Sequence, residues 1–186
     1  AARVARFCDV RLGKGIVAAR DTPGFIANRI GIFDTLQALW ALESGRYSIE
    51  DIDRMSGPAI GRPTSATFRM LDIVGIDVFA SAIASLRLRL DGAGERETFV
   101  TPPVVGGLLS RGWIGNKSGR GFYAHSTAAS DRTTLPDLVF DPATFTYGAR
   151  RSAVPTAMAP VSTADLRDRF LGRDSLGEYL RATLGR

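Results

Sequence analysis

The longest regular hydrophobic pattern in the chain lies within residues Asp21 to Glu43. Its apolar residues recur every three or four positions, a spacing that predicts an amphipathic helix. They are Phe25, Ile26, Ile30, Phe33, Leu36, Leu39 and Trp40. Thr22 is a candidate N-cap, Pro23 suits a first helical position, and Gly45 stands where helices often stop. The pattern predicts one long helix entered at Thr22.

Small and polar residues form a second stripe on this helix. Gly24, Asn28, Gly31 and Thr35 are three or four positions apart, so they share one face. Glycines on both sides of one amide leave a groove where another group can approach the backbone closely. Two interpretations stay open. Either the stripe packs against a neighbouring helix with Asn28 hydrogen-bonded to a loop, or Asn28 binds a ligand lying along the stripe.

Four shorter helices are expected next, each between a capping residue and a stop. They run from Ser48 to Gly57, from Thr64 to Gly75, from Asp77 to Leu90 and from Thr101 to Gly112. Ser48 and Asp51 have the spacing of a capping box. Residues 91–94 are expected to form a loop. Helices joined by short connections predict an all-α, bundle-like unit over residues 22–112.

The composition of the sequence changes at Trp113. Residues 113–123 combine three glycines and two cations with flanking aromatic residues. Such a loop can cradle an anion with its backbone amides, or its aromatic residues can plug the helical core, which we favour. Residues 124–137 are expected to be a polar linker, and 138–147 a small hairpin or an extended excursion. Late helices are expected after Ser162 or Thr163 and after Ser175.

The first 21 residues have a different pattern. Residues 1–8 suggest the tail of a helix, and Ile16 to Ala19 form a short apolar strand. A strand needs a sheet, and little in the remaining sequence can pair with it. We therefore expect residues 1–21 to be the remnant of a preceding α/β domain.

Composition and charge narrow the function classes. The 186 residues carry a net charge of +5, but there is no basic run with interleaved aromatic residues, so nucleic-acid binding is not expected. The excess of arginine suits a solvated surface or a ligand that carries phosphates. No segment is long and apolar enough to cross a membrane, and Cys8 is the one cysteine. We expect a cytoplasmic protein without nucleic-acid or membrane partners.

The residues that carry chemistry are few. His125 is the one histidine, and no carboxylate stands at helical spacing from it, so no oriented general base is evident. One histidine and one cysteine do not form a usual metal-ligand set. The chain contains no Gly-x-Ser-x-Gly elbow, P-loop or Gly-x-Gly-x-x-Gly turn. Its residues indicate a substrate-side domain that does not hold a complete active site.

Three motifs together resemble the C-terminal helical domain of the 3-hydroxyacyl-CoA dehydrogenases. They are Asp21-Thr22-Pro23-Gly24-Phe25-Ile26-Ala27-Asn28-Arg29, Asp72-x-x-Gly75-x-Asp77, and Gly112-Trp113 with Lys117-Ser118-Gly119-Arg120-Gly121-Phe122-Tyr123. The resemblance spans about residues 9–123. It implies the all-α fold of the 6-phosphogluconate dehydrogenase C-terminal-like type, with a domain over 22–123 and a linker and peripheral segment over 124–186.

The resemblance also implies a function and a site. The family oxidises (3S)-3-hydroxyacyl-CoA with NAD in fatty-acid β-oxidation. The resemblance implies that Asn28 belongs to the active site as a catalytic residue. It also implies that Gly24, Phe25 and Gly31 lie beside Asn28 as substrate-binding residues. NAD and a catalytic His–Glu pair would lie in a preceding Rossmann domain absent from this chain. A homodimer through the helical domain and a fused enoyl-CoA hydratase are further implied partners.

The chain departs from the family pattern in places. The His–Glu pair and the glycine-rich loop are absent, so this chain is predicted to be inactive alone. Gly61 to Phe68 differ from the usual Gly-x-Pro-Met-Gly-Pro-Phe, which leaves the acyl-chain preference open. Two alternatives remain: the helical domain of another β-hydroxyacid-type dehydrogenase, which would lack the Lys117–Tyr123 loop, and a non-catalytic oligomerisation or binding module.

Overall fold

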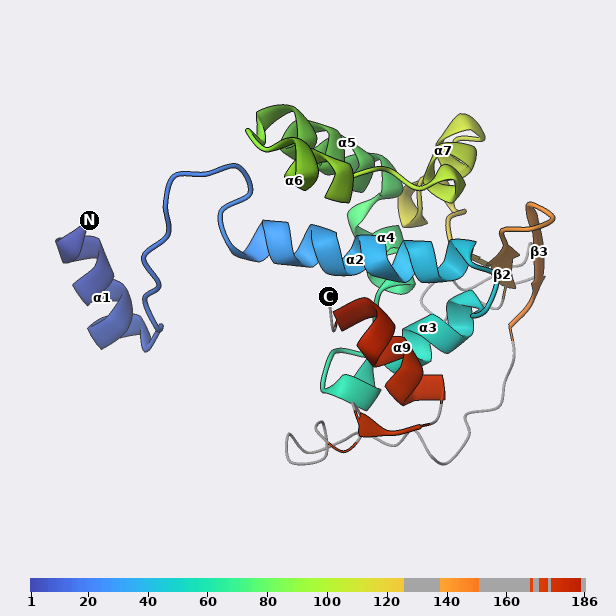
Figure 1. Cartoon of the computed structure of the whole chain (residues 1–186), viewed down its shortest axis with the longest axis horizontal. Coiled ribbons are helices and arrows are strands. Elements are labelled where there is room, and N and C mark those ends of the chain that lie inside the picture. The colour runs from blue at the N-terminus through green and yellow to red at the C-terminus, as the bar shows by residue number, and fades with distance from the viewer. Residues whose placement is uncertain (126–137, 151–167, 169–170, 174, 185–186) are drawn as a thin grey trace.

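The computed structural model describes residues 1–125, 138–150, 168, 171–173 and 175–184. The described chain is mostly helical with a small three-stranded sheet, which confirms the predicted all-α class (Figure 1). Its elements are α1 (Ala2–Leu12), α2 (Ala27–Glu43), α3 (Ile49–Ser56), η1 (Pro58–Ile60), α4 (Phe68–Val74), α5 (Ile76–Arg89), α6 (Ala93–Thr98), α7 (Pro103–Ser110), η2 (Asn116–Ser118), β1 (Tyr123–Ala124), β2 (Leu138–Asp141), β3 (Thr146–Ala149) and α9 (Ser175–Leu184). No described helix is long and apolar enough to cross a membrane.

The long helix α2 organises the molecule. It runs between α5, α6 and α7 on one side and α3 and α9 on the other (Figure 1). Its second half buries Leu36, Leu39 and Leu42 in the core. Its first half extends past α3 and α9 while α5 and α6 lie alongside it, and Ile26 and Ile30 are exposed there (Figure 1). The predicted helix is therefore confirmed, and its first turns expose apolar side chains.

The start of the chain stands apart from the bundle. Helix α1 has no buried residue and is joined to α2 by an extended segment (Figure 1). The strand expected over Ile16 to Ala19 is wrong, because these residues form no strand in the structure. Without a partner strand, an isolated extended segment has nothing to pair with. The division of the chain at residue 21 stays a prediction.

The entry to α2 differs from the predicted cap. The helix begins at Ala27, not beside Thr22, and no side chain caps it. Thr22 instead opens a turn in which its carbonyl accepts a 3.0 Å hydrogen bond from the Phe25 N–H. Gly24 has φ +74°, and a Cβ there would lie 3.0 Å from Arg29 Cγ and 3.3 Å from Leu86 Cδ1. Gly24 is therefore part of a tight turn and not of the helical stripe.

Local and tertiary caps behave differently along the bundle. The Ser48–Asp51 capping box is confirmed by hydrogen bonds of 3.1 and 3.2 Å. The helix predicted from Thr64 begins at Phe68, because Asp53 of α3 binds that end. The Asp53 carboxylate accepts hydrogen bonds from the N–H groups of residues 67, 68 and 69, at 3.0, 2.7 and 3.3 Å.

Two further predictions about caps and loops were wrong. Asp77 lies inside the first turn of α5 and does not cap it. Its carboxylate instead receives Lys117 Nζ at 2.7 Å, which ties α5 to η2. The loop expected over residues 91–94 gives way to α6 from Ala93. Helix α7 is capped by a distant side chain, since Glu43 Oε1 accepts a 2.7 Å hydrogen bond from the Val104 N–H.

The loop over residues 113–123 closes the core, as the aromatic-plug interpretation predicted. Phe122 is completely buried, with its ring centroid 4.7 Å from that of Phe68. The carboxylate of Asp72 accepts hydrogen bonds from the backbone N–H groups of Phe122 and Tyr123, at 2.9 and 2.8 Å. These hydrogen bonds join the second and third motifs of the family resemblance. We call Asp72, Phe122 and Tyr123 the clamp.

The remaining described residues cover this core. Strands β1, β2 and β3 form an antiparallel sheet, and the predicted hairpin is confirmed by the pairing of β2 with β3. Helix α9 lies against α2 and buries Leu176, Tyr179 and Leu180, which makes it a cover of the bundle. Most of the linker predicted over 124–137 and the caps predicted at Ser162 or Thr163 lie outside the described residues.

Candidate functional site

Asn28 lies in the first turn of α2, on the part of the helix that extends past α3 and α9. It is exposed, and its side chain has no hydrogen-bond partner among the described residues. A Cβ on Gly31 would meet nothing within 4 Å. Thr35 of the same stripe is buried, as the packing interpretation expects, whereas Asn28 and Gly31 are exposed. The packing interpretation therefore holds for the Thr35 end of the stripe only.

The face that carries Asn28 continues into the core. Asn28, Gly31, Thr35, Leu39 and Leu42 follow one another at steps of three or four residues, so they share one side of α2. The last three are buried. One helical face thus leads from the bundle interior to an uncovered amide, which places Asn28 at an edge that another surface can cover.

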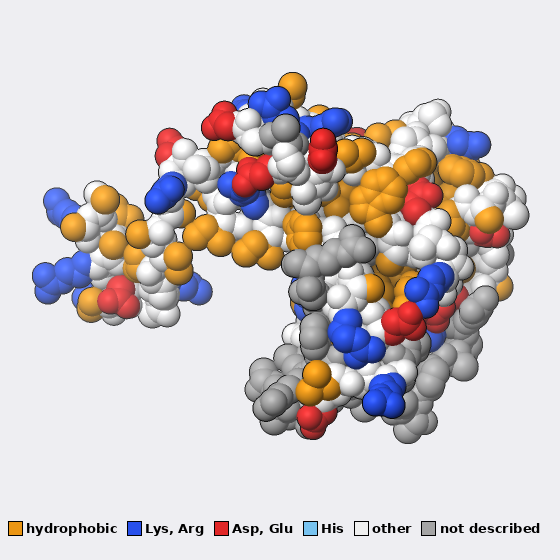
Figure 2. Space-filling view, in the orientation of Figure 1, with side chains coloured by type: hydrophobic (Ala, Val, Ile, Leu, Met, Phe, Trp, Pro, Cys, Tyr) orange, Lys and Arg blue, Asp and Glu red, His pale blue; other side chains and the backbone are white. Residues whose placement is uncertain are grey.

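Apolar side chains surround this part of the helix. Phe25 is 58% exposed and Ile30 is 64% exposed, and Ile26 beside them is also exposed. Hydrophobic side chains follow α2 where it leaves the bundle (Figure 2). Phe25 is held in a left-handed conformation, with φ +47°, which is uncommon for a residue other than glycine. Exposed apolar side chains gathered in this way are typical of surfaces that contact another protein or a ligand.

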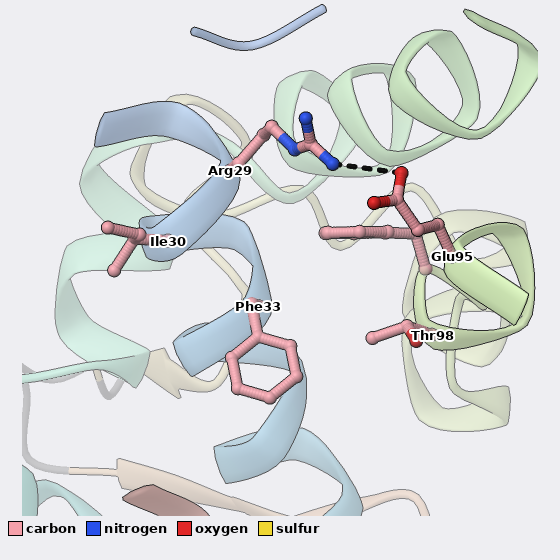
Figure 3. Close-up of a pocket in the computed structure, with 6 residues that line it drawn as sticks. Arg29, Ile30, Phe33, Glu95 and Thr98 are labelled. Atoms are coloured by element: carbon pink, nitrogen blue, oxygen red, sulfur yellow. Dashed lines mark hydrogen bonds and ion pairs between the residues drawn. The ribbon is translucent and has the colours of Figure 1, made fainter. Parts of the chain in front are cut away.

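A pocket of about 260 Å³ lies between α2 and α6. It is lined by Arg29, Ile30, Phe33, Glu95, Thr98 and Phe99. Arg29 of α2 and Glu95 of α6 form a 2.9 Å ion pair across it (Figure 3). Only Arg29 and Ile30 come from the neighbourhood of Asn28. The sequence did not predict a role for Glu95. It is 66 residues from Arg29 in the chain, and no local pattern indicates that the two side chains meet.

The strongly shifted acids belong to the clamp and not to the Asn28 surface. Burial raises the pKa of Asp72 to about 7, against the hydrogen bonds donated by the amides of Phe122 and Tyr123. Burial likewise raises the pKa of Asp53 to about 6, although three backbone amides and the Tyr123 hydroxyl bind the carboxylate. Both side chains bind backbone amides, so their role is to hold elements together.

His125 follows β1 and does not form a catalytic pair in the described structure. Its Nδ1 is buried and has no hydrogen-bond partner among the described residues. No described group of three or more His, Cys, Asp or Glu side chains is arranged to hold a metal ion. The Asn28 amide is thus one hydrogen-bonding group that a ligand at α2 can reach, beside the Arg29–Glu95 ion pair.

The described residues also do not fit a dinucleotide such as NAD. The usual site needs a parallel strand, a glycine-rich turn and a helix N-terminus. The sheet that the structure describes is antiparallel, and its first strand, β1, begins at Tyr123 of the clamp. A dinucleotide used with this surface has to be held by other residues.

The sequence and the fold are similar to those of known proteins. The model of the family described as "3-hydroxyacyl-CoA dehydrogenase, C-terminal domain" matches residues 24–125. A "Probable 3-hydroxyacyl-CoA dehydrogenase" of Bacillus subtilis is 42% identical over 153 residues, which are 82% of this chain and 18% of the relative. A "Putative fatty acid oxidation complex trifunctional enzyme" of Rickettsia felis is 32% identical over 127 residues, covering 68% of this chain and 18% of the relative.

A solved structure shows the same fold. The crystal structure of M. tuberculosis FadB2 matches with a TM-score of 0.57 and 28% identity, over 67% of this chain and 42% of that one. The chain therefore spans less than half the length of each of these relatives. The family match includes the first half of α2 with Asn28, the clamp and the α2–α6 pocket.

Proposed function

Because the chain belongs to the 3-hydroxyacyl-CoA dehydrogenase family, through a C-terminal domain that matches more than half of its 186 residues, we propose that it forms one wall of a dehydrogenase active site. The reaction is the oxidation of a (3S)-3-hydroxyacyl-CoA to the 3-oxoacyl-CoA with NAD. The other wall, with the dinucleotide and the proton acceptor, belongs to a preceding nucleotide-binding domain of Rossmann type.

The observation that carries this proposal is the open amide of Asn28. A side-chain amide that serves packing is normally buried and paired, whereas Asn28 is exposed on an uncovered face. Phe25, Ile26 and Ile30, which flank Asn28 along the chain, are exposed apolar side chains that suit contact with a second domain and an acyl group. Gly31 keeps the space beside the amide free, since no side chain stands there.

The proposed role of Asn28 follows from the charge that develops during oxidation. As the C3 alcohol becomes a carbonyl, an amide N–H directed at its oxygen stabilises the partial negative charge there and fixes its position. Gly24, Phe25 and Gly31 bound the space around the substrate. NAD, when bound by the nucleotide-binding domain, supplies the hydride acceptor. Residues 1–186 alone are accordingly expected to be inactive.

The test is turnover of a protein that carries both domains. Asn28→Ala should lower kcat for 3-hydroxybutyryl-CoA by about 100-fold, the scale of losing one donor to a developing oxyanion. Asn116→Ala is the matched control, because Asn116 is an exposed asparagine of η2 away from α2. Equal turnover of the two variants would refute the proposal.

A second candidate function is self-association through the helical domain. Ile26, Ile30 and Trp40 are exposed along the side of α2 that faces away from Leu39, as helical spacing requires. A two-fold dimer needs one surface that fits itself. Sedimentation of the chain tests this candidate: Ile30→Asp should convert a dimer to a monomer, and a monomer at all concentrations would refute it.

The same proposal covers the wider protein. The name of the Rickettsia felis relative describes a trifunctional enzyme, so a fused enoyl-CoA hydratase is a reasonable partner to seek beside this domain. A cytoplasmic location stays a prediction. Western detection of the full protein together with hydratase assays on the same purified material would decide the fusion.

A further inference from the structure

The first turn of α2 contacts two neighbouring helices, α5 and α6. It extends past α3 and α9, and α5 and α6 lie on its other side (Figure 1). The turn at Gly24 joins it to Leu86 of α5 on one side. Arg29 reaches a second element, α6, because its guanidinium pairs with Glu95 at 2.9 Å.

The contact between α2 and α6 is loose apart from this ion pair. The two helices enclose an open pocket of about 260 Å³, so their side chains do not interlock there. Figure 3 shows the Arg29 side chain reaching across to Glu95, with Ile30, Phe33 and Thr98 beside the pocket. Helix α6 itself is short, and residues 94–98 are exposed. The ion pair is therefore the polar connection between α2 and α6 that the structure describes.

We infer that Glu95, acting through Arg29, is a positioning residue for the Asn28 amide. The inference rests on the proposed function of Asn28. Arg29 follows Asn28 directly in the chain, so the backbone that orients one side chain carries the other. Glu95 lies 66 residues away and has no other evident reason to contact the start of α2.

The stem of Arg29 makes this connection stiff. Its Cγ lies 3.0 Å from the position that a Cβ on Gly24 would occupy, so the stem packs against the entry turn. The Arg29 side chain is 28% exposed, against 56% for Glu95. Arg29 is thus held between the turn at Gly24 and the carboxylate of α6, and a shift of either moves the first turn of α2.

Energetics separate a positioning role from a stabilising one. A partly exposed ion pair contributes little to stability, so its loss should hardly change the melting temperature. The rate of a reaction depends far more steeply on position, since a misplacement of about 1 Å can cost roughly 100-fold. Removing Glu95 should therefore reduce turnover much more than it reduces stability.

The experiment compares five variants of the protein that carries both domains: Asn28→Ala, Glu95→Gln, the combination of these two, Glu95→Asp, and Glu97→Gln. Glu97 is an exposed acid of the same helix and is the matched control. Glu95→Gln should lower kcat about tenfold with little change in KM or melting temperature. Glu97→Gln should match the wild type, and Glu95→Asp, which keeps the carboxylate, should recover most of kcat.

The combined variant distinguishes the possible outcomes. If Glu95 acts through Asn28, Glu95→Gln lowers kcat no further once Asn28 is alanine. The inference is overturned if Glu95→Gln behaves like Glu97→Gln, or if it lowers kcat equally in both backgrounds. Wild-type turnover of Asn28→Ala would instead refute the proposed function itself.

Discussion

The carboxylate of Asp72 accepts a 2.9 Å hydrogen bond from the backbone N–H of Phe122, fifty residues later in the chain. This bond explains why two motifs so far apart occur together. Asp72 holds the strand that follows the glycine-rich loop, and Asp77 receives Lys117 from the same loop. The motifs around Asp72 and Phe122 build the bundle, whereas the motif around Asn28 faces outward.

Removal of the Asp72 carboxylate should destabilise the domain strongly. Asp72→Ala leaves the buried amides of Phe122 and Tyr123 without acceptors, at about 1–3 kcal/mol for each unsatisfied group. Urea unfolding followed by circular dichroism measures the change. Asp91→Ala is the control, because Asp91 is exposed. A loss no larger than that of the control would contradict the role of Asp72.

Gly121 should not tolerate a side chain. A Cβ at this position would lie 2.0 Å from Asp72 Oδ1, so Gly121→Ala must displace the carboxylate. Gly148 of β3 is the matched control, since a Cβ there meets nothing within 4 Å. We expect Gly121→Ala to cost about 1–3 kcal/mol of unfolding free energy, as overpacking does. Gly148→Ala should be nearly neutral, and equal melting temperatures would count against the clamp.

Glu43 should act as the N-cap of α7 although it belongs to α2. Its side chain accepts the Val104 N–H at 2.7 Å, so Glu43→Ala leaves that donor without its protein partner. Loss of a cap costs about 1 kcal/mol, which thermal unfolding can resolve when Glu97→Ala is measured beside it. Hydrogen exchange should quicken at the first turn of α7, and unchanged exchange there would disprove the cap.

The stability of the domain should fall as the pH rises from about 5 to 8. Burial raises the pKa of Asp72 to about 7 and that of Asp53 to about 6, both above the ordinary value near 4. At a pH between the ordinary value and these raised values, the two carboxyl groups bind more protons in the folded chain than in the unfolded chain. Raising the pH therefore favours unfolding. Urea titrations at several pH values measure the slope. Asp72→Asn should reduce it, and a stability that rises over this range would contradict the assignment.

Local sequence signals predicted some elements well and others not at all. Ser48 and Asp51 cap their own helix through a spacing visible in the sequence, and Gly45 follows the end of α2. The caps expected at Thr64 and Asp77 were wrong because α4 is capped from α3 by Asp53, and Asp77 binds Lys117. Partners brought together by the fold leave no local pattern.

The candidate site was predictable only in part. The resemblance pointed to Asn28, but helical spacing could not tell whether its stripe is covered, because α2 extends past α3 and α9. Gly24 leaves the stripe because the chain makes a tight turn there with positive φ. Glu95 was not predicted. Its ion pair with Arg29 depends on α6, and the sequence predicted a loop at the start of that helix.

The central claim is that the Asn28 amide contributes to the chemical step. Single-turnover oxidation of 3-hydroxybutyryl-CoA at saturating substrate and NAD measures that step without product release. In a protein that carries both domains, Asn28→Ala should slow the single-turnover rate constant by about 100-fold, and Asn116→Ala should leave it unchanged. A rate constant for Asn28→Ala within about twofold of the wild type, with the fold intact, would contradict the account, since roughly 1.4 kcal/mol of lost stabilisation already gives tenfold.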